Sequence, residues 1–350
     1  MSWDSSSKHE PLDITVMKKN LLLTLLALVM PMLASAYDAK IDGIYYNFVG
    51  DEAFVTYQEC IQVEQDGKTI NKYVSDYTGD IIIPETVTHE GKTYCVTAIG
   101  DHAFMGCSSV TSVTIPESVT SIGGCAFYGC ESLSSVNIPS KVKTLSQALF
   151  YKCISLTSIT IPESVDSIGA YAFWFCERLT SVNIPKGVKN LEYSVFSDCT
   201  SLTSVTIPES VISIGEWAFH NCTSLPSITI PKGVKSIGLA AFQKCTALTT
   251  VTIPESVTSI GAQAFHGCSS LTTVTIPQGV ASIGKHTFSD CINLVSIDIP
   301  NGVISIGEHA FEKCSSLTSI TIPMGVKNIG DVAFLRCTAQ VLPPLLCLTT

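Results

Sequence analysis

The sequence is poor in charged residues and has no excess of basic ones. Charged residues make up only 14% of the 350 positions, and 30 acidic residues against 20 Lys and Arg give a net charge of −10. Proteins that bind nucleic acid carry a basic surface, and peripheral binding to anionic lipid also needs basic clusters. The composition therefore argues against both kinds of partner.

The motifs of common catalytic sites are also missing. The chain has no phosphate-binding glycine loop, no His/Glu zinc motif and no nucleophile elbow. The positions expected to face inward repeat as apolar residues or cysteine, so no buried polar cluster is available in which a pKa could be tuned. We therefore expect no enzymatic activity, no cofactor and no dedicated metal site.

Near the N-terminus, the apolar run from Leu21 to Met32 is shorter than the ~20 residues that a membrane-spanning helix needs. Two lysines precede it, and the small residues up to Ala36 follow it, which is typical of a secretory signal peptide. We expect a signal peptide over residues 17–36 with cleavage after Ala36, and a secreted or cell-surface protein. Residues 1–16 are polar and patternless, and we interpret them as a spurious N-terminal extension.

Instead of these motifs the chain has a 23-residue repeat. Ile-Pro recurs at this step from Ile115 to Ile322, a phenylalanine recurs from Phe104 to Phe334, and a cysteine from Cys107 to Cys337. Unbroken register over so many copies is typical of a solenoid, because one insertion would shift every later contact between coils. In such a stack, residues one repeat apart lie ~4.8 Å from each other.

Within a repeat, the alternating run before Ile138 predicts a strand that the proline ends. A short second strand over 165–168 is followed by Gly169, where we expect a positive φ. The spacing of 172–176 predicts about one helical turn. The fold class is thus a β-rich α/β solenoid. Two coils lack the glycine and should be strained, at Leu145-Ser146 and Leu191-Glu192.

We predict an N-terminal β-hairpin cap over residues 37–92, a repeat solenoid over 93–337 and an irregular tail over 338–350 that risks self-association. The repeat cysteines point parallel to one another, which favours core packing over disulfides. Cys60 and Cys95 in the cap region are better disulfide candidates. The states of Cys125 and Cys347 stay open.

The candidate partner-binding residues lie beside the repeated phenylalanine, where aromatic side chains are typical interface anchors. They are Tyr128, Tyr151, Trp174, Trp217 and His220. The alternative is that they only cover neighbouring coils. The outward Ser and Thr of the long strands form a second possible surface, although threonine is also a good polar strand former. His286 and His309 share a column, where two imidazoles could hold a metal weakly, but a surface coincidence is the preferred interpretation.

The repeat L-x-x-V-x-I-P-x-x-V-x-x-I-G-x-x-A-F-x-x-C resembles the BspA-like, treponemal-type leucine-rich repeats of bacterial surface proteins over residues 80–337. The resemblance implies a right-handed leucine-rich-repeat solenoid and adhesion to host or extracellular-matrix proteins. Proline replaces the asparagine that follows the strand in better-known leucine-rich repeats. We therefore expect a secreted binding protein for host or bacterial surface proteins. A glycan-binding module and a structural spacer without a ligand are the alternatives.

Overall fold

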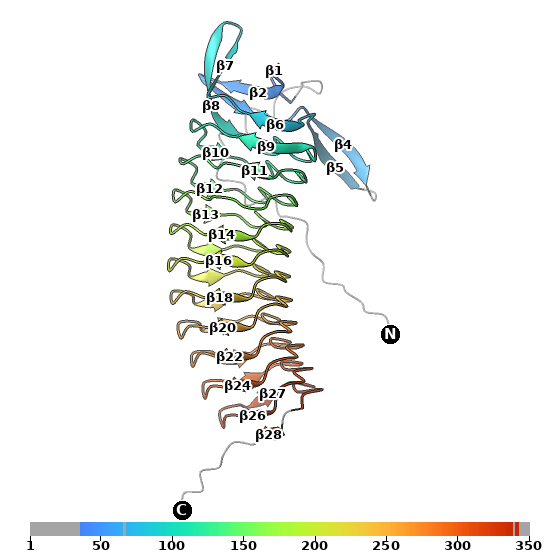
Figure 1. Cartoon of the computed structure of the whole chain (residues 1–350), viewed down its shortest axis with the longest axis vertical. Helices are drawn as coiled ribbons and strands as arrows, with labels where there is room; N and C mark the ends of the chain where they lie inside the picture. Colours follow the sequence, from blue (N-terminus) through green and yellow to red (C-terminus); the bar gives the residue numbers. More distant parts are fainter. Residues whose placement is uncertain (1–35, 66–67, 339, 343–350) are drawn as a thin grey trace, which may run out of the picture. The chain divides into compact units, whose positions relative to one another are not determined.

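The structure is a computed structural model that describes residues 36–65, 68–338 and 340–342 (Figure 1). Within these ranges every regular element is a β-strand, and no helix is long and apolar enough to cross a membrane. The proposed extension over 1–16, the signal peptide upstream of Ala36, and the end of the tail with Cys347 lie outside the described residues.

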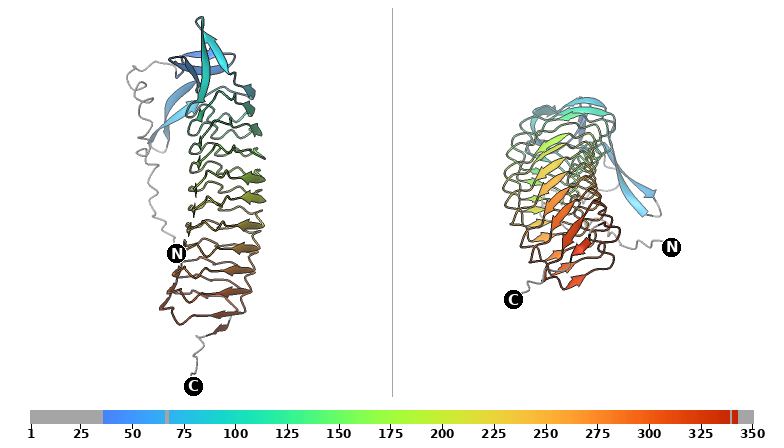
Figure 2. Two further views of the ribbon diagram at one scale, coloured as in Figure 1. Left: turned by 90° about the vertical axis from the view of Figure 1, so that its left-hand side faces the viewer. Right: turned by 60° about the horizontal axis from the view of Figure 1, so that its bottom comes forward.

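The repeats form a β-solenoid of about ten coils, whose strands lie in parallel rows in Figure 2. One row, here called the proline ladder, holds strands that precede the repeated Ile-Pro, together with β28, which pairs with β26. They are β6 (Gly79–Ile82), β9 (Val110–Thr114), β11 (Ser135–Val136), β14 (Ser181–Asn183), β16 (Ser204–Thr206), β18 (Ser227–Thr229), β20 (Thr250–Thr252), β22 (Thr273–Thr275), β24 (Ser296–Asp298), β26 (Ser319–Thr321) and β28 (Gln340–Leu342).

A second row, the glycine ladder, holds two-residue strands that precede the repeated glycine position. They are β10 (Ser121–Ile122), β12 (Thr144–Leu145), β13 (Ser167–Ile168), β15 (Asn190–Leu191), β17 (Ser213–Ile214), β19 (Ser236–Ile237), β21 (Ser259–Ile260), β23 (Ser282–Ile283), β25 (Ser305–Ile306) and β27 (Asn328–Ile329). Pairing is parallel, and Val251 lies opposite Val274, one repeat away. The predicted register is confirmed.

The core is a set of columns that run along the stack. The repeated phenylalanines from Phe104 to Phe311 are fully buried, and the ring centroids of neighbours lie 5.2 to 5.6 Å apart. From Cys130 to Cys337, each repeated thiol donates to a phenylalanine carbonyl in the preceding coil, as Cys199 Sγ does to Phe173 O at 3.2 Å. The cysteine column is therefore core packing, as expected, and it satisfies carbonyls that would otherwise lack a second donor.

The two disulfide candidates of the N-terminal region are not bonded to each other. Cys60 and Cys95 are both free and exposed, and Cys125 is free and partly buried. Cys60 lies opposite Tyr73 in one sheet, whereas Cys95 lies opposite Glu52 and Thr86 in another. The two thiols thus sit on separate sheets, which sequence spacing alone does not reveal.

The helical turn predicted for each repeat is wrong. Over 171–175 the chain makes consecutive tight turns, in which Tyr171 has φ 62° and Phe175 has φ 59°, a conformation that a right-handed helix cannot contain. The amides of Tyr171, Phe173 and Phe175 donate instead to carbonyls of the next coil at 2.9 to 3.1 Å. Alternate amides of the turn thus bond to the next coil, where a helix would bond within itself.

The prediction of a positive φ at Gly169 is also wrong. A Cβ atom there would lie 2.7 Å from the backbone nitrogen of Gln147 in the preceding coil. Glycine is needed for close backbone approach rather than for its φ range. Ser146 and Glu192 replace this glycine, and neither has a positive φ. The Ser146 hydroxyl donates to Ile122 O at 2.6 Å, so the expected strain is absent from its backbone.

Residues before the repeats build their own strands. β1 (Ala39–Ile41), β2 (Ile44–Val49), β3 (Glu52–Val55), β7 (Thr86–His89) and β8 (Lys92–Ile99) form one sheet, which β10 joins by pairing with β8. Hairpins are present here, because β2 pairs antiparallel with β3, and β7 with β8. A further hairpin, β4 (Glu59–Gln65) with β5 (Lys68–Val74), was not predicted. Tyr77 contacts Phe104 at a centroid distance of 4.6 Å, which joins this region to the phenylalanine column.

Candidate functional site

Two side chains of each coil lie on the turns beside the core phenylalanine, and in most coils at least one of them is partly exposed. One lies two residues before the phenylalanine, here the −2 position, and the other lies one residue after it, the +1 position. In the coil of Phe173 these are Tyr171 and Trp174, and the Trp174 amide donates to the Tyr171 carbonyl at 3.1 Å. The backbone repeats while the residues at −2 and +1 change from coil to coil. Where the residues of these two columns are partly exposed, the differences between coils change the surface.

Aromatic side chains occupy these turns in consecutive coils. The Tyr128 and Tyr151 rings stack at a centroid distance of 4.3 Å, and Tyr151 meets Trp174 edge-on at 5.1 Å. Tyr171 stacks on Trp174 at 5.2 Å. With their neighbours they form one connected group of partly exposed rings, here called the aromatic cluster: Tyr128, Tyr151, Tyr171, Trp174, Phe175 and Tyr193.

The Trp174 ring is held in a fixed orientation. Its Nε1 donates to Asp198 Oδ2 at 2.9 Å, and the same carboxylate accepts from Ser197 Oγ and Asn221 Nδ2, each at 2.8 Å. Burial raises the pKa of Tyr128 to about 12, with a smaller effect of the neighbouring Tyr151. Its hydroxyl therefore stays protonated, and able to donate, over the physiological range.

The structure does not place Trp217 and His220 in this cluster. Among the described residues their ring contact is with each other, edge-on at 4.8 Å. The Nδ1 atom of His220 is buried and has no hydrogen-bond partner in the described chain. Burial lowers the pKa of His220. Three of the five predicted residues thus lie together, and the other two form a separate pair.

The Ser and Thr residues of the proline ladder face outward, as predicted, but many of their hydroxyls are already used. Thr180 Oγ1 donates to Thr157 O at 3.1 Å, and Thr203 Oγ1 donates to Thr180 O at 3.0 Å. In the same way, Thr249 Oγ1 donates to Pro226 O and Thr272 Oγ1 donates to Thr249 O, each one repeat back. Part of this surface therefore bonds one coil to the next, which leaves fewer free donors for a ligand.

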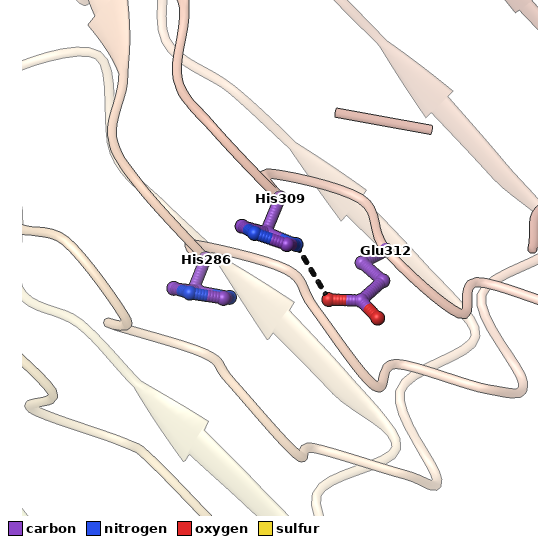
Figure 3. A group of neighbouring side chains, drawn as sticks. All are labelled: His286, His309 and Glu312. Carbon is purple, nitrogen blue, oxygen red and sulfur yellow. Dashed lines mark hydrogen bonds and ion pairs between the residues drawn. The ribbon is translucent and has the colours of Figure 1, made fainter. Parts of the chain in front are cut away.

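A third group lies on the −2 and +1 columns toward the C-terminal end of the repeats. The imidazoles of His286 and His309 stack with centroids 4.5 Å apart, and His309 Nδ1 lies 2.7 Å from Glu312 Oε2 (Figure 3). Glu308 Oε1 lies 3.3 Å from the other ring nitrogen of His309 and is paired with Lys285. Three potential metal ligands therefore converge where two histidines were expected to meet by coincidence.

Comparison with known proteins assigns the repeat. Six copies of the family described as "BspA type Leucine rich repeat region" match residues 97–226 and 213–340, which is more than half of the chain. The chain belongs to this family. Membership in the BspA-type family suggests protein binding or a role at the cell surface.

Two crystal structures show how far this BspA-type chain resembles known relatives. A leucine-rich repeat protein from Bacteroides ovatus is 26% identical with a TM-score of 0.64, over 88% of this chain and 100% of that one. A leucine rich cell surface protein from Faecalibacterium prausnitzii is 32% identical with a TM-score of 0.55, over 87% and 94%. Among curated proteins, none matches the chain.

Sequence reasoning missed four residues of these groups. Phe175 and Tyr193 belong to the aromatic cluster, Asp198 fixes Trp174, and Glu312 completes the histidine group. Phe175 and Asp198 share the position two residues after the core phenylalanine, and Glu312 is at +1. These residues can be found from the sequence when all coils are aligned on the repeated phenylalanine and each turn position is compared as a column.

Proposed function

We propose that this BspA-type protein is a secreted or cell-surface adhesion protein that binds host or extracellular-matrix proteins through the aromatic cluster. The observation that carries the proposal is the continuity of the cluster over adjacent coils, with every ring partly exposed. Contiguous exposed aromatic surface is costly unless it is used. Trp and Tyr are the residue types that anchor protein interfaces most often, and truncating such an anchor costs about 2 kcal/mol or more.

The scaffold supports this role because it is rigid under the cluster. The phenylalanine column behind it is fully buried, and the turn amides bond from coil to coil. Little side-chain entropy is then lost when a partner docks, since Asp198 already holds Trp174. Binding energy is thus available for affinity rather than for ordering the surface.

Several further expectations belong to the same proposal. We propose that the strands over 37–92 cap the first coil, because β3 pairs with β8 and β8 with β10 at that end. A right-handed coil, a signal peptide over 17–36 and the lack of enzymatic activity complete the proposal. Self-association at the C-terminal coils is supported by exposed apolar side chains there: Met324, Ile329, Val332 and Leu335.

The test is binding of the purified chain to a panel of matrix proteins and to a glycan array. The test variant is Tyr151→Ser/Trp174→Gln, because serine and glutamine already occupy the +1 position as Ser197 and Gln243. The fold therefore tolerates these residues at this position. The matched control on the other surface is Thr229→Ala/Thr252→Ala, which changes exposed threonines of adjacent proline-ladder strands.

Saturable binding to a matrix protein that weakens at least tenfold in the aromatic variant, and not in the threonine variant, supports the proposal. The opposite pattern moves the site to the hydroxyl surface. Binding to glycans alone supports the glycan-binding alternative, for which stacked tyrosines also offer flat surfaces. No binding on either array favours a structural spacer.

A further inference from the structure

The histidine group toward the C-terminal end of the repeats contains a buried atom without a partner. His286 Nδ1 is buried and makes no hydrogen bond in the described chain. Leaving a buried polar atom unpaired is unfavourable. His286 and His309 both occupy the −2 position, with φ 54° and 56°, and Figure 3 shows their rings one above the other beside Glu312. A ligand seated there would satisfy the unpaired nitrogen.

The three side chains offer one ligand atom each within a small space. Those atoms all lie within 4.8 Å of one another. Two imidazoles and a carboxylate are a nitrogen and oxygen donor set that suits zinc and related divalent transition ions, and a set of three leaves one tetrahedral position open. The donor set therefore has both the number and the chemical type of an open metal site.

The surroundings of His309 add an independent observation. Metal-binding histidines usually give their second ring nitrogen to a carboxylate, which fixes the ring and raises its basicity. His309 has this arrangement, because Glu308 Oε1 lies 3.3 Å from Nε2 while Nδ1 faces Glu312. Glu308 is in turn held by Lys285 at 2.7 Å. The ring is thus positioned from both sides, with Nδ1 on the side of the proposed site.

We propose that His286, His309 and Glu312 bind one divalent transition ion, with Zn²⁺ as the representative, and that the ion clamps two adjacent coils together. The ion replaces the proton shared by His309 and Glu312, which is released to solvent. Zinc–nitrogen bonds of about 2.0–2.1 Å require the ligand atoms to approach one another. The two rings are parallel to within 10°, so one of them tilts to direct its lone pair at the ion.

The clamp has room to form because the group lies at the surface. The side chain of His309 is 25% exposed and that of Glu312 is 15% exposed. Both rings sit on turns whose amides are bonded to neighbouring coils, so side-chain rotation suffices and the backbone stays in place. The open position accepts water or a donor from a partner.

The test is isothermal titration of the full chain with ZnCl₂, using a Cys60→Ser/Cys95→Ser background so that the exposed thiols do not compete. One equivalent should bind. His286→Gln and Glu312→Gln should each weaken binding at least tenfold. Glu308→Gln, which removes only the outer carboxylate, should weaken it by about 10–100-fold. His220→Gln, which changes a half-buried histidine outside the group, should bind as the background does.

Absorption of the Co²⁺-substituted protein provides a second readout. The expected spectrum has the d–d bands of a tetrahedral nitrogen and oxygen site, without sulfur-to-cobalt charge transfer. Variants that still melt cooperatively but lose the spectrum support the site. The proposal is overturned if the background binds no ion, if binding is unchanged in both His286→Gln and Glu312→Gln, or if sulfur charge transfer appears.

Discussion

The buried thiol column should make the protein sensitive to alkaline pH. From Cys130 to Cys291 eight repeated cysteines are 0% exposed, and burial is the main cause that raises the pKa of each of them. For Cys245 the pKa rises from 9.0 to about 12. Above pH 9 an unfolded chain therefore ionises thiols that the folded chain keeps protonated.

The sign and size of the effect follow from proton linkage. The contribution of each thiol to the free energy of unfolding is complete below pH 9 and falls by about 1.4 kcal/mol per pH unit until the folded pKa is reached. For Cys245 the three units between 9.0 and about 12 amount to about 4 kcal/mol. At pH 10, eight such thiols together cost about 11 kcal/mol, which is comparable with the whole stability of a typical domain.

The assay is urea denaturation followed by circular dichroism at half-unit steps from pH 8 to 10.5. Cys245→Ala should reduce the slope of stability against pH above 9 by about 1.4 kcal/mol per pH unit. It should also lower stability at pH 8 by about 1 kcal/mol through the small cavity. Cys95→Ala is the control, because Cys95 is exposed and free. If the Cys245→Ala slope equals that of the unmodified chain, the thiol is not held protonated by burial and the argument is wrong.

Three further predictions concern the turns. Gly123→Ala should destabilise the chain by about 2 kcal/mol, because the added Cβ collides with the backbone amide of the preceding coil. The control Gly124→Ala should be tolerated, because its Cβ meets nothing closer than 3.7 Å. Urea melts of the two variants test the difference. Val332 has φ 52°, so Val332→Asn should raise stability by about 1 kcal/mol in thermal melts, and a loss would contradict the strain. Asp198→Asn should destabilise the protein by about 1–2 kcal/mol, because one amide oxygen cannot accept from all the donors that the carboxylate serves, including Trp174. An unchanged midpoint of urea unfolding would show that the carboxylate is dispensable.

The sequence predicts the periodic part of the fold well, because a solenoid repeats one local solution. The fixed step of Ile-Pro and of Phe104 to Phe334 is enough to give the ladders, the phenylalanine column and the buried cysteines. The turns are not predicted, because Tyr171 and Phe175 adopt a positive φ that their residue types disfavour. The bonds from coil to coil stabilise that conformation, and they exist only once the stack has formed.

Outside the repeats, the sequence also carries a signal for the hairpin of β4 and β5. The residues between β4 and β5 include Asp66-Gly67, flanked by runs rich in strand-forming residues, which is a strong hairpin pattern. The candidate sites were predicted only in part from the sequence. Tyr128, Tyr151 and Trp174 were found because their +1 column is visible in the sequence, but Glu312 escaped notice because a lone glutamate is common on a surface.

The separation of a constant interior from variable −2 and +1 columns makes one strong prediction. If ligand specificity lies in these columns, a site should move with its residues. Ala240, Gln263 and His266 stand two repeats before His286, His309 and Glu312, and Ala240 and Gln263 already have φ 52° and 59°. The substitutions Ala240→His, Gln263→His and His266→Glu therefore place the same donors on the same backbone.

This triple variant should bind a second equivalent of Zn²⁺ in the Cys60→Ser/Cys95→Ser background, with the same Co²⁺ spectrum as the original group. Its matched control is Ala240→Gln, Gln263→His and His266→Gln, which keeps one imidazole and removes the converging set. Two equivalents in the first variant and one in the second would show that the repeat backbone alone creates the geometry. A single equivalent in both, with the cooperative melt retained, would mean that Glu308 or another neighbour outside the two columns is essential, and that the columns by themselves do not determine what the surface binds.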